Sequence, residues 1–386
     1  MKTNPPYDSL DTPIVLVDLN KLEFNIDEMQ RTANDAGIRL RPHIKIHESA
    51  LIAKLQMDKG ACGIEVGPVD QAEIFAREGF QDIMIAHPFY GNRKLEKLKS
   101  LICLPNLRVT VVVDMFEQAE RISSIGKQVG KKVPLLLKID TGGKRYGTLP
   151  KEPALEMALS LGKLEDIEFK GIYSHEIVKA NPTIEDVKTL AFNTSLMMEQ
   201  TANLLKDHEI CVDHVSVGAS PTYRATCEYI KQGKFSTITE IHPGSCIIGD
   251  MIYVKNLAIE EKMCAVSVLA SVISTSHQNH AILDVGSKAL GSDCIIARSE
   301  TPGFYWQGRP SFGTVRGRPD LWLGRLSAET SCIYYKESVK GLSLGDRLEI
   351  IPNNAIVTIN IHDKLYGVRD GEVEIIIPVT GRGKGN

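Results

Sequence analysis

The chain has 386 residues, of which 43% are hydrophobic and 24% charged, and its formal net charge at pH 7 is −3. This composition is typical of a globular protein with one large domain and a smaller one, and the absence of a long basic run gives a nucleic-acid-binding surface no support. No apolar run approaches the roughly 20 residues that a membrane span needs, and residues 1–6 lack the apolar stretch of a secretory signal, so we expect a cytoplasmic protein.

Short apolar segments alternate with helical segments between residues 38 and 243. Several are rich in valine and isoleucine, as buried parallel strands tend to be, and we expect strands at 38–41, 62–66, 83–87, 108–113, 134–139, 169–174, 214–218 and 238–242. The apolar spacing predicts helices that include 22–36, 69–78 and 184–205. Eight strand–helix units over roughly 200 residues indicate a (β/α)₈ barrel, and a doubly wound sheet is the alternative.

Polar side chains follow most of these predicted strands. In a (β/α)₈ barrel the active site gathers at the carboxyl ends of the strands. The polar residues at those ends are Lys45, His87, Asp140, His175, Ser220 and His242. This agreement favours the barrel over the doubly wound sheet.

After residue 253 the pattern changes to β-type runs separated by turns. The expected strands are 265–275, 281–285, 332–335, 347–351, 356–361 and 373–379. We predict a second, mainly antiparallel β domain, completed by the N-terminal strand 14–18. The predicted boundaries are 20–250 for the barrel, and 1–19 with 251–386 for the β domain.

A lysine between two histidines follows the first barrel strand, in the segment from Arg41 to His47. Pro42 is poorly tolerated inside a central strand, so Lys45 and His47 are expected at the mouth of the barrel. A lysine whose pKa is lowered by burial or a neighbouring cation can form a Schiff base with an aldehyde cofactor. The alternative is a solvated lysine on a loop.

Two segments of small and hydroxyl residues follow the last two barrel strands. Gly218, Ser220 and Thr222 follow one strand, and Gly244 and Ser245 follow the next. Small residues let backbone N–H groups approach an anion, and the hydroxyls add donors. These segments therefore predict a phosphate site, and ordinary turns are the alternative.

Three further side chains at the strand ends could contact a flat cofactor ring. Arg145 follows the fifth strand, and an arginine that faces a pyridine nitrogen keeps that nitrogen unprotonated because arginine cannot give up its proton. Tyr173 and His175 end the sixth strand, where either could stack on a ring or bind its substituents. A solvated arginine, a core tyrosine and a structural histidine are the alternatives.

Taken together, these segments resemble the D-threonine aldolase and D-serine dehydratase family of pyridoxal-phosphate enzymes, which share the alanine-racemase-like barrel called fold type III. The resemblance spans nearly the whole chain, with matching stretches at 12–18, 42–47, 218–222 and 365–371. It implies an alanine racemase-like (β/α)₈ TIM-type barrel with a C-terminal antiparallel β domain, and pyridoxal 5'-phosphate as the cofactor.

The resemblance also implies residue roles. Lys45 would bind the cofactor covalently, Arg145 would lie near its pyridine nitrogen, and Tyr173 or His175 would contact its ring. His47 would lie close to the substrate as a base or orienting group. The phosphate would be held by Gly218, Ser220, Thr222, Gly244 and Ser245. The family is commonly dimeric, so a homodimer is expected.

The chain departs from the family at the metal site. Family lyases hold a divalent metal with a histidine and, two residues later, a cysteine or aspartate, whereas the matching positions here are Asn354 and Ile356. Isoleucine cannot bind a metal, and an asparagine amide is a weak ligand for zinc. No metal residue is therefore predicted.

Three functions follow. The first is a pyridoxal-phosphate lyase that cleaves or dehydrates a D-configured 3-hydroxy amino acid without the family's metal site; His47 would take the hydroxyl proton for cleavage, or Lys45 the α-proton for dehydration. The second is a metal-independent amino-acid racemase, which needs a second acid–base group besides Lys45, either His47 or a tyrosine of the neighbouring subunit. The third is a cofactor-binding protein without turnover, which the second domain disfavours. The whole-chain resemblance favours the lyase.

Overall fold

The computed structural model describes residues 7, 10–296, 306, 308–335 and 341–385. They form two compact units, one from the described parts of 1–26, 46–52 and 245–382, and one from 27–45, 53–244 and 383–385. We call them the β unit and the barrel unit; the domain boundaries at 20 and 250 stay predictions. Within the described part of the chain, no helix has the length and apolarity to cross a membrane.

The barrel unit is built on parallel strands in the order β2-β9-β8-β7-β6-β5-β4-β3. Their bounds are β2 Arg39–Leu40, β3 Ile64–Val66, β4 Asp82–Ile85, β5 Arg108–Val113, β6 Val133–Lys138, β7 Ile167–Tyr173, β8 His214–Val217 and β9 Glu240–Ile241. The two end strands also meet, because the Cys62 N–H donates to the Leu40 carbonyl and the Glu65 N–H to the Pro42 carbonyl, both at 2.9 Å. The sheet therefore closes on itself, and the predicted barrel is confirmed.

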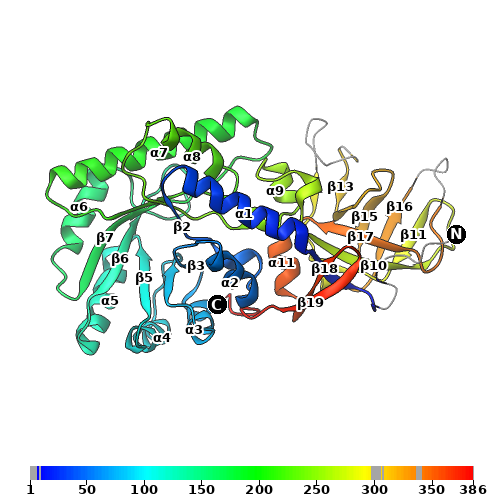
Figure 1. Cartoon of the computed structure of the whole chain (residues 1–386), viewed down its shortest axis with the longest axis horizontal. Coiled ribbons are helices and arrows are strands. Elements are labelled where there is room, and N and C mark those ends of the chain that lie inside the picture. The colour runs from blue at the N-terminus through cyan, green and yellow to red at the C-terminus, as the bar shows by residue number, and fades with distance from the viewer. Residues whose placement is uncertain (1–6, 8–9, 297–305, 307, 336–340, 386) are drawn as a thin grey trace. The chain divides into compact units, whose positions relative to one another are not determined.

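Helices alternate with the barrel strands and lie outside them (Figure 1). They are α1 Leu19–Asp35, α2 Ala50–Asp58, α3 Val69–Arg77, α4 Asn92–Cys103, α5 Phe116–Val129, α6 Glu152–Leu161, α7 Ile184–Asp207 and α8 Tyr223–Lys231. In α7, Thr183 and Asp186 form a reciprocal capping box that satisfies free N–H groups of the first turn. The predicted helices at 22–36, 69–78 and 184–205 are confirmed to within a few residues.

The β unit contains a mainly antiparallel sheet in the order β15-β16-β11-β10-β1-β18-β19, with β17 paired to β10 and to β14. The bounds are β1 Ile14–Asp18, β10 Val266–Ser274, β11 His280–Leu283, β14 Gly313–Val315, β15 Trp322–Leu326, β16 Ser331–Tyr334, β17 Arg347–Pro352, β18 Lys364–Arg369 and β19 Glu372–Pro378, with a separate pair β12 Ile295–Ile296 and β13 Pro310–Ser311. The N-terminal strand β1 pairs with β10 and β18, as predicted.

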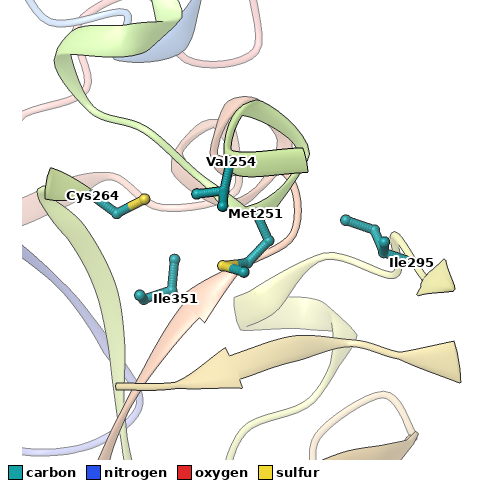
Figure 2. Close-up of a cluster of buried hydrophobic side chains, with 5 residues drawn as sticks. All are labelled: Met251, Val254, Cys264, Ile295 and Ile351. Carbon is teal, nitrogen blue, oxygen red and sulfur yellow. The ribbon is translucent and has the colours of Figure 1, made fainter. Parts of the chain in front are cut away.

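One side of this unit is closed by a buried apolar cluster beneath the short helix α9 (Met251–Lys255). Met251, Val254, Cys264, Ile295 and Ile351 pack together there (Figure 2). Because these side chains come from both sheets and from α9, their burial joins the elements into one core.

The predicted strand at 356–361 is wrong, because residues Ala355–Asn360 form the helix α11. The four consecutive β-branched residues at 356–359 favour a strand, but Asn354 caps a helix by accepting a hydrogen bond from the Val357 N–H. Ala355, Thr358 and Ile359 are buried at helical spacing. Tertiary packing has therefore overridden local β propensity.

Substitution of Gly171 by alanine should destabilise the barrel unit. Gly171 has φ +139° beside a register shift between β6 and β7, and an added Cβ would lie 1.9 Å from the His214 carbonyl oxygen. Overpacking and backbone strain together should lower the free energy of unfolding by about 3 kcal/mol or more. Gly130→Ala is the control, since Gly130 has φ +65° but open space around it and should lose about 1 kcal/mol. Chemical denaturation measures both free energies of unfolding, and equal losses for Gly171→Ala and Gly130→Ala would contradict the close contact with the His214 carbonyl.

Candidate active site

Lys45 lies in a short 3₁₀ turn, η1 (Ile44–Ile46), which begins soon after β2 ends. Burial lowers the pKa of its amine; the carboxyl of Glu65 opposes this shift, and the guanidinium of Arg145 adds to it. A lysine with a lowered pKa is neutral, and hence nucleophilic, at a lower pH than a solvated one. A lowered lysine pKa of this kind is what formation of a Schiff base with an aldehyde requires.

The turn from Gly218 to Thr222 lies next to the chain at Gly244. The Gly244 N–H donates to Ser220 Oγ at 3.3 Å, and Gly218 has φ +106°. The Thr222 hydroxyl accepts from the Ala219 N–H at 3.0 Å and so stabilises the turn itself. The predicted phosphate segments thus meet in one place, with Thr222 acting at least partly as a structural residue.

Gly244 also brings this turn to the lysine segment. An added Cβ at Gly244 would lie 2.0 Å from the His43 carbonyl oxygen, so only glycine permits this approach. The His43 N–H donates to the Pro243 carbonyl at 3.2 Å. Lys45, two residues further on, is therefore anchored beside the predicted anion site. Ser245 begins the part of the chain that belongs to the β unit.

A row of polar side chains runs around the inside of the barrel. Lys138, Tyr173, Ser216 and Glu240 are register partners on β6 to β9. Glu240 accepts from Arg41 Nε at 3.2 Å and from Ser216 Oγ at 3.2 Å. Barrel interiors are usually filled by branched apolar side chains, so a row of polar side chains at this position indicates a role other than core packing.

Glu65 on β3 joins this row. It is fully buried, and Tyr173 Oη donates to its Oε1 at 2.9 Å. Burial raises its pKa to about 8, against the opposing effects of Tyr173, Lys138 and Lys45. Burial also lowers the pKa of Lys138 to about 8. Glu65 and Lys138 were not predicted as site residues, although a charged residue inside an apolar strand was the available signal.

Four histidines surround these groups. Burial lowers the pKa of His43, His175 and His242 well below the usual range, and that of His87 to about 4. The His242 ring stacks on Tyr173 with 4.3 Å between centroids, and its Nδ1 lies 2.9 Å from Ser216 Oγ. These imidazoles are therefore neutral, so they can form hydrogen bonds but add no positive charge to the site.

Arg145 and His175 line a small pocket at the strand ends, with a volume of about 20 Å³. Its lining also includes Lys138, Asp140 and Tyr146. The guanidinium of Arg145 lies 5.0 Å from the centre of the Tyr146 ring. Tyr173, by contrast, is buried with its ring stacked on His242, so of the two predicted ring contacts His175 is the more accessible.

His47 lies in the part of the chain that belongs to the β unit. It is fully buried, and its Nδ1 accepts a hydrogen bond from the Ser49 N–H at 3.0 Å. An accepting Nδ1 carries no proton, so the neutral ring carries its proton on Nε2. In this form Nε2 is the ring nitrogen that can donate a hydrogen bond.

The positions that match the family's metal ligands have other roles in the β unit. The Asn354 side chain caps α11 and donates from Nδ2 to Asp293 Oδ1 at 3.2 Å. Ile356 is the second residue of that helix. An engaged amide and an alkyl chain do not form a donor set for zinc.

Comparison with known proteins agrees with this architecture. Residues 17–251 match the family described as "Alanine racemase, N-terminal domain", and 265–368 match the "Putative serine dehydratase domain". The chain is 29% identical to the 3-hydroxy-D-aspartate aldolase of Paracoccus denitrificans (97% of this chain, 93% of that one), and 29% identical to the D-threo-3-hydroxyaspartate dehydratase of a Delftia species (91% and 92%). The crystal structure of D-threonine aldolase from Filomicrobium marinum superposes with a TM-score of 0.86, at 27% identity and full coverage of both chains.

The chain therefore belongs to the alanine racemase N-terminal domain family. Within that family it is a pyridoxal-phosphate enzyme of the aldolase and dehydratase type, which is a lyase. The amine of Lys45, whose pKa is lowered by burial, belongs to a segment that Gly244 brings close to the turn of small and hydroxyl residues at 218–222; this arrangement fits a cofactor that carries both an aldehyde and a phosphate.

Replacement of Glu176 should change how stability depends on pH. Glu176 is buried after β7, and burial raises its pKa to about 7, although N–H groups of Glu176 and Gly218 and the Thr222 hydroxyl oppose the shift. Between about pH 4.5 and 7 the folded chain holds a proton that the unfolded chain has lost, so wild-type stability falls as the pH rises.

Glutamine does not titrate, so Glu176→Gln should lack this pH dependence. Its free energy of unfolding relative to wild type should therefore increase by up to about 3 kcal/mol from pH 5 to pH 8. Denaturation of the cofactor-free protein at both pH values measures the difference. Glu168→Gln, on the exposed face of the same strand, should show none. A wild-type-like pH dependence for Glu176→Gln would contradict the buried neutral carboxyl.

Proposed function

We propose that this protein is a pyridoxal-phosphate lyase that acts on a D-configured 3-hydroxy amino acid, by retro-aldol cleavage or dehydration, without the family's metal site. The observation that carries the proposal is the buried amine of Lys45, with its lowered pKa, beside the turn formed by Gly218, Ser220 and Gly244. The activities of the similar aldolases and dehydratases support the substrate class.

Within this proposal each site residue has a role. Lys45 binds the cofactor through its amine; the turn that includes Gly218, Ser220 and Thr222 holds the phosphate with Gly244 and Ser245; and His175 rather than Tyr173 contacts the ring. Arg145 faces the pyridine nitrogen and keeps it unprotonated. When bound, the cofactor supplies an aldehyde for the substrate amine and a ring that stabilises negative charge at the α-carbon.

The chain's own groups then move the protons. Lys45, once released from the cofactor, takes the α-proton in dehydration. The resemblance implies that His47 lies close to the substrate, and its Nε2 carries a proton because Nδ1 accepts from Ser49. A donating Nε2 suits the departure of a hydroxyl group as water better than the removal of a hydroxyl proton. This tautomer therefore favours dehydration over retro-aldol cleavage.

The metal-free chemistry is supported by the residues at the metal positions. Asn354 is occupied as a helix cap and Ile356 has no donor atom. The same observation favours a metal-independent racemase as the second candidate, with Lys45 and either His47 or a partner tyrosine as the two bases. A cofactor-binding protein without turnover, the third candidate, is disfavoured by the large second unit.

Purified enzyme with D-threonine, D-serine, D-threo-3-hydroxyaspartate and D-alanine should separate these functions. We expect a keto acid with ammonia from dehydration, or glycine with an aldehyde from cleavage, and the same rate with a chelator present. Loss of optical rotation alone would identify the racemase. Lys45→Ala should abolish both the turnover and the Schiff-base absorbance, and inactivation by the chelator would contradict the metal-free reaction.

Restoring the family's ligand pair provides a second test. The double variant Asn354→His, Ile356→Cys should bind zinc, measured by dialysis and metal analysis, whereas the wild type should not. It should also lose about 1 kcal/mol of stability, because Asn354 caps α11. Asn354→Ser with Ile356→Val, which keeps a cap and adds no ligand, is the matched control. Stoichiometric zinc in the wild type would overturn the assignment.

Two further features complete the proposal. A homodimer, in which the β domain of one subunit closes the site of the other, would supply the partner tyrosine that the racemase alternative needs. A cytoplasmic location suits an enzyme of small amino acids. Light scattering of the purified protein measures the first, and cell fractionation the second.

A further inference from the structure

Glu65 is the least expected side chain inside the barrel. It occupies the middle of β3, between Ile64 and Val66, with no exposed surface. One carboxyl oxygen accepts from Tyr173, whereas Oε2 has no hydrogen-bond partner within the described part of the chain. A buried oxygen without a partner is costly to fold, so it points to a role in function.

Ionisable groups face Glu65 from every side of the barrel. His43 Nε2 lies 3.7 Å from its Oε1, and His242 Nδ1 lies 4.0 Å from its Oε2. These groups include His43 and Lys45 from the segment after β2, Lys138 on β6, Tyr146 after β6, Tyr173 on β7, and Glu240 and His242 from β9. The surrounding histidines are neutral, whereas the amines of Lys45 and Lys138 carry positive charge when protonated.

Glu240, another acidic side chain inside the barrel, is already paired. Glu240 is bound by Arg41, whose second nitrogen donates to Asp82 Oδ1 at 2.6 Å. Glu65, by contrast, lies beside the segment that carries Lys45, because its N–H donates to the Pro42 carbonyl at 2.9 Å and its Oε1 lies 3.7 Å from His43 Nε2. Its negative charge favours the charged form of both Lys45 and Lys138. Arg145 acts on the same two amines in the opposite direction.

We propose that Glu65 is a positioning residue whose carboxylate stabilises the protonated amine of Lys45, an inference that rests on the proposed role of Lys45 as the cofactor-binding lysine. When Lys45 takes a proton from the substrate α-carbon, a neutral buried amine becomes a buried ammonium. Burial and Arg145 both disfavour this ammonium, and the carboxylate of Glu65 offsets them. Lys45 can then accept a proton and later return it.

The two groups titrate as a coupled pair. Burial raises the pKa of Glu65 to about 8, although the charges of Lys138 and Lys45 oppose the shift. A proton on Lys45 makes ionisation of Glu65 easier, so the two groups can share one proton. The hydrogen bond from Tyr173 and the stack of that ring on His242 hold the carboxyl in place.

The first experiment needs no bound cofactor. The rate at which an amine-acylating reagent labels Lys45 in the apoenzyme, followed by peptide mass spectrometry, reports the neutral fraction of the amine as the pH changes. Glu65→Gln should lower the midpoint of this profile by about 1 pH unit or more, because an opposite charge has been removed. Glu65→Asp should stay close to wild type, and so should Glu168→Gln on the exposed face of β7.

An unchanged midpoint in Glu65→Gln would overturn the inference. If that variant does not fold, Glu65→Met, which has a similar length and no charge, gives the same comparison. A purely structural role for Glu65 would change the melting temperature of the apoenzyme but leave the midpoint where it is.

The second experiment uses the loaded enzyme. In Glu65→Gln, exchange of the substrate α-proton with deuterated water should slow by at least about tenfold, since one pH unit of amine basicity is tenfold in protonation, with little change in KM. If wild-type protein forms no Schiff base at Lys45, the proposed function fails, whereas the apoenzyme labelling still decides what Glu65 does. If the Schiff base forms and exchange in the variant is as fast as in wild type, only the inference about Glu65 fails.

Discussion

The site depends on one close approach between two backbone segments. Gly244 meets the His43 carbonyl so closely that no side chain could stand between them, and the adjacent Pro243 carbonyl accepts from the His43 N–H. This contact joins the end of β9 to the segment that carries Lys45. Without it, a turn of backbone donors and a reactive amine would be two separate features of a large barrel. With it, they become one site that can hold a phosphate at one end and an aldehyde at the other.

The second constraint is electrostatic. Lys45, Lys138 and the exposed Arg145 lie near the mouth of the barrel, and burial lowers the pKa of the two lysine amines by disfavouring their charged forms. Neutral histidines, acidic side chains and the Tyr173 hydroxyl surround these amines. Glu240 forms an ion pair with Arg41, whereas Glu65 interacts electrostatically with Lys45 and Lys138. Buried ion pairs contribute little net stability, so the main effect of this polar interior is on the protonation of the lysine amines.

Much of the fold could be predicted from the sequence, because buried parallel strands are short valine- and isoleucine-rich runs with helices between them. All the predicted barrel strands exist, and so does the contribution of β1 to the antiparallel sheet. The error at α11 had a local cause: its β-branched residues suggest a strand, and only the packing of Ala355 and Ile359 with the cap at Asn354 makes a helix. Lys45 and the glycine turns could be predicted as candidates because their residue types are distinctive. Glu65 and Lys138 were missed because each sits within an apolar strand, where the pattern was interpreted as core and the facing charges belong to strands far away in the sequence.

The way the ring closes has a consequence for how the chain folds as it is synthesised. β2 carries the reactive segment but pairs with β9, some 200 positions later in the chain, and only then does the ring have no open edge. A nascent chain on the ribosome would therefore lack one of the two neighbours of β2 until nearly two thirds of the protein has emerged. During that interval the segment after β2 would also lack its contact with Gly244, so the site can be completed only after β9 has been synthesised.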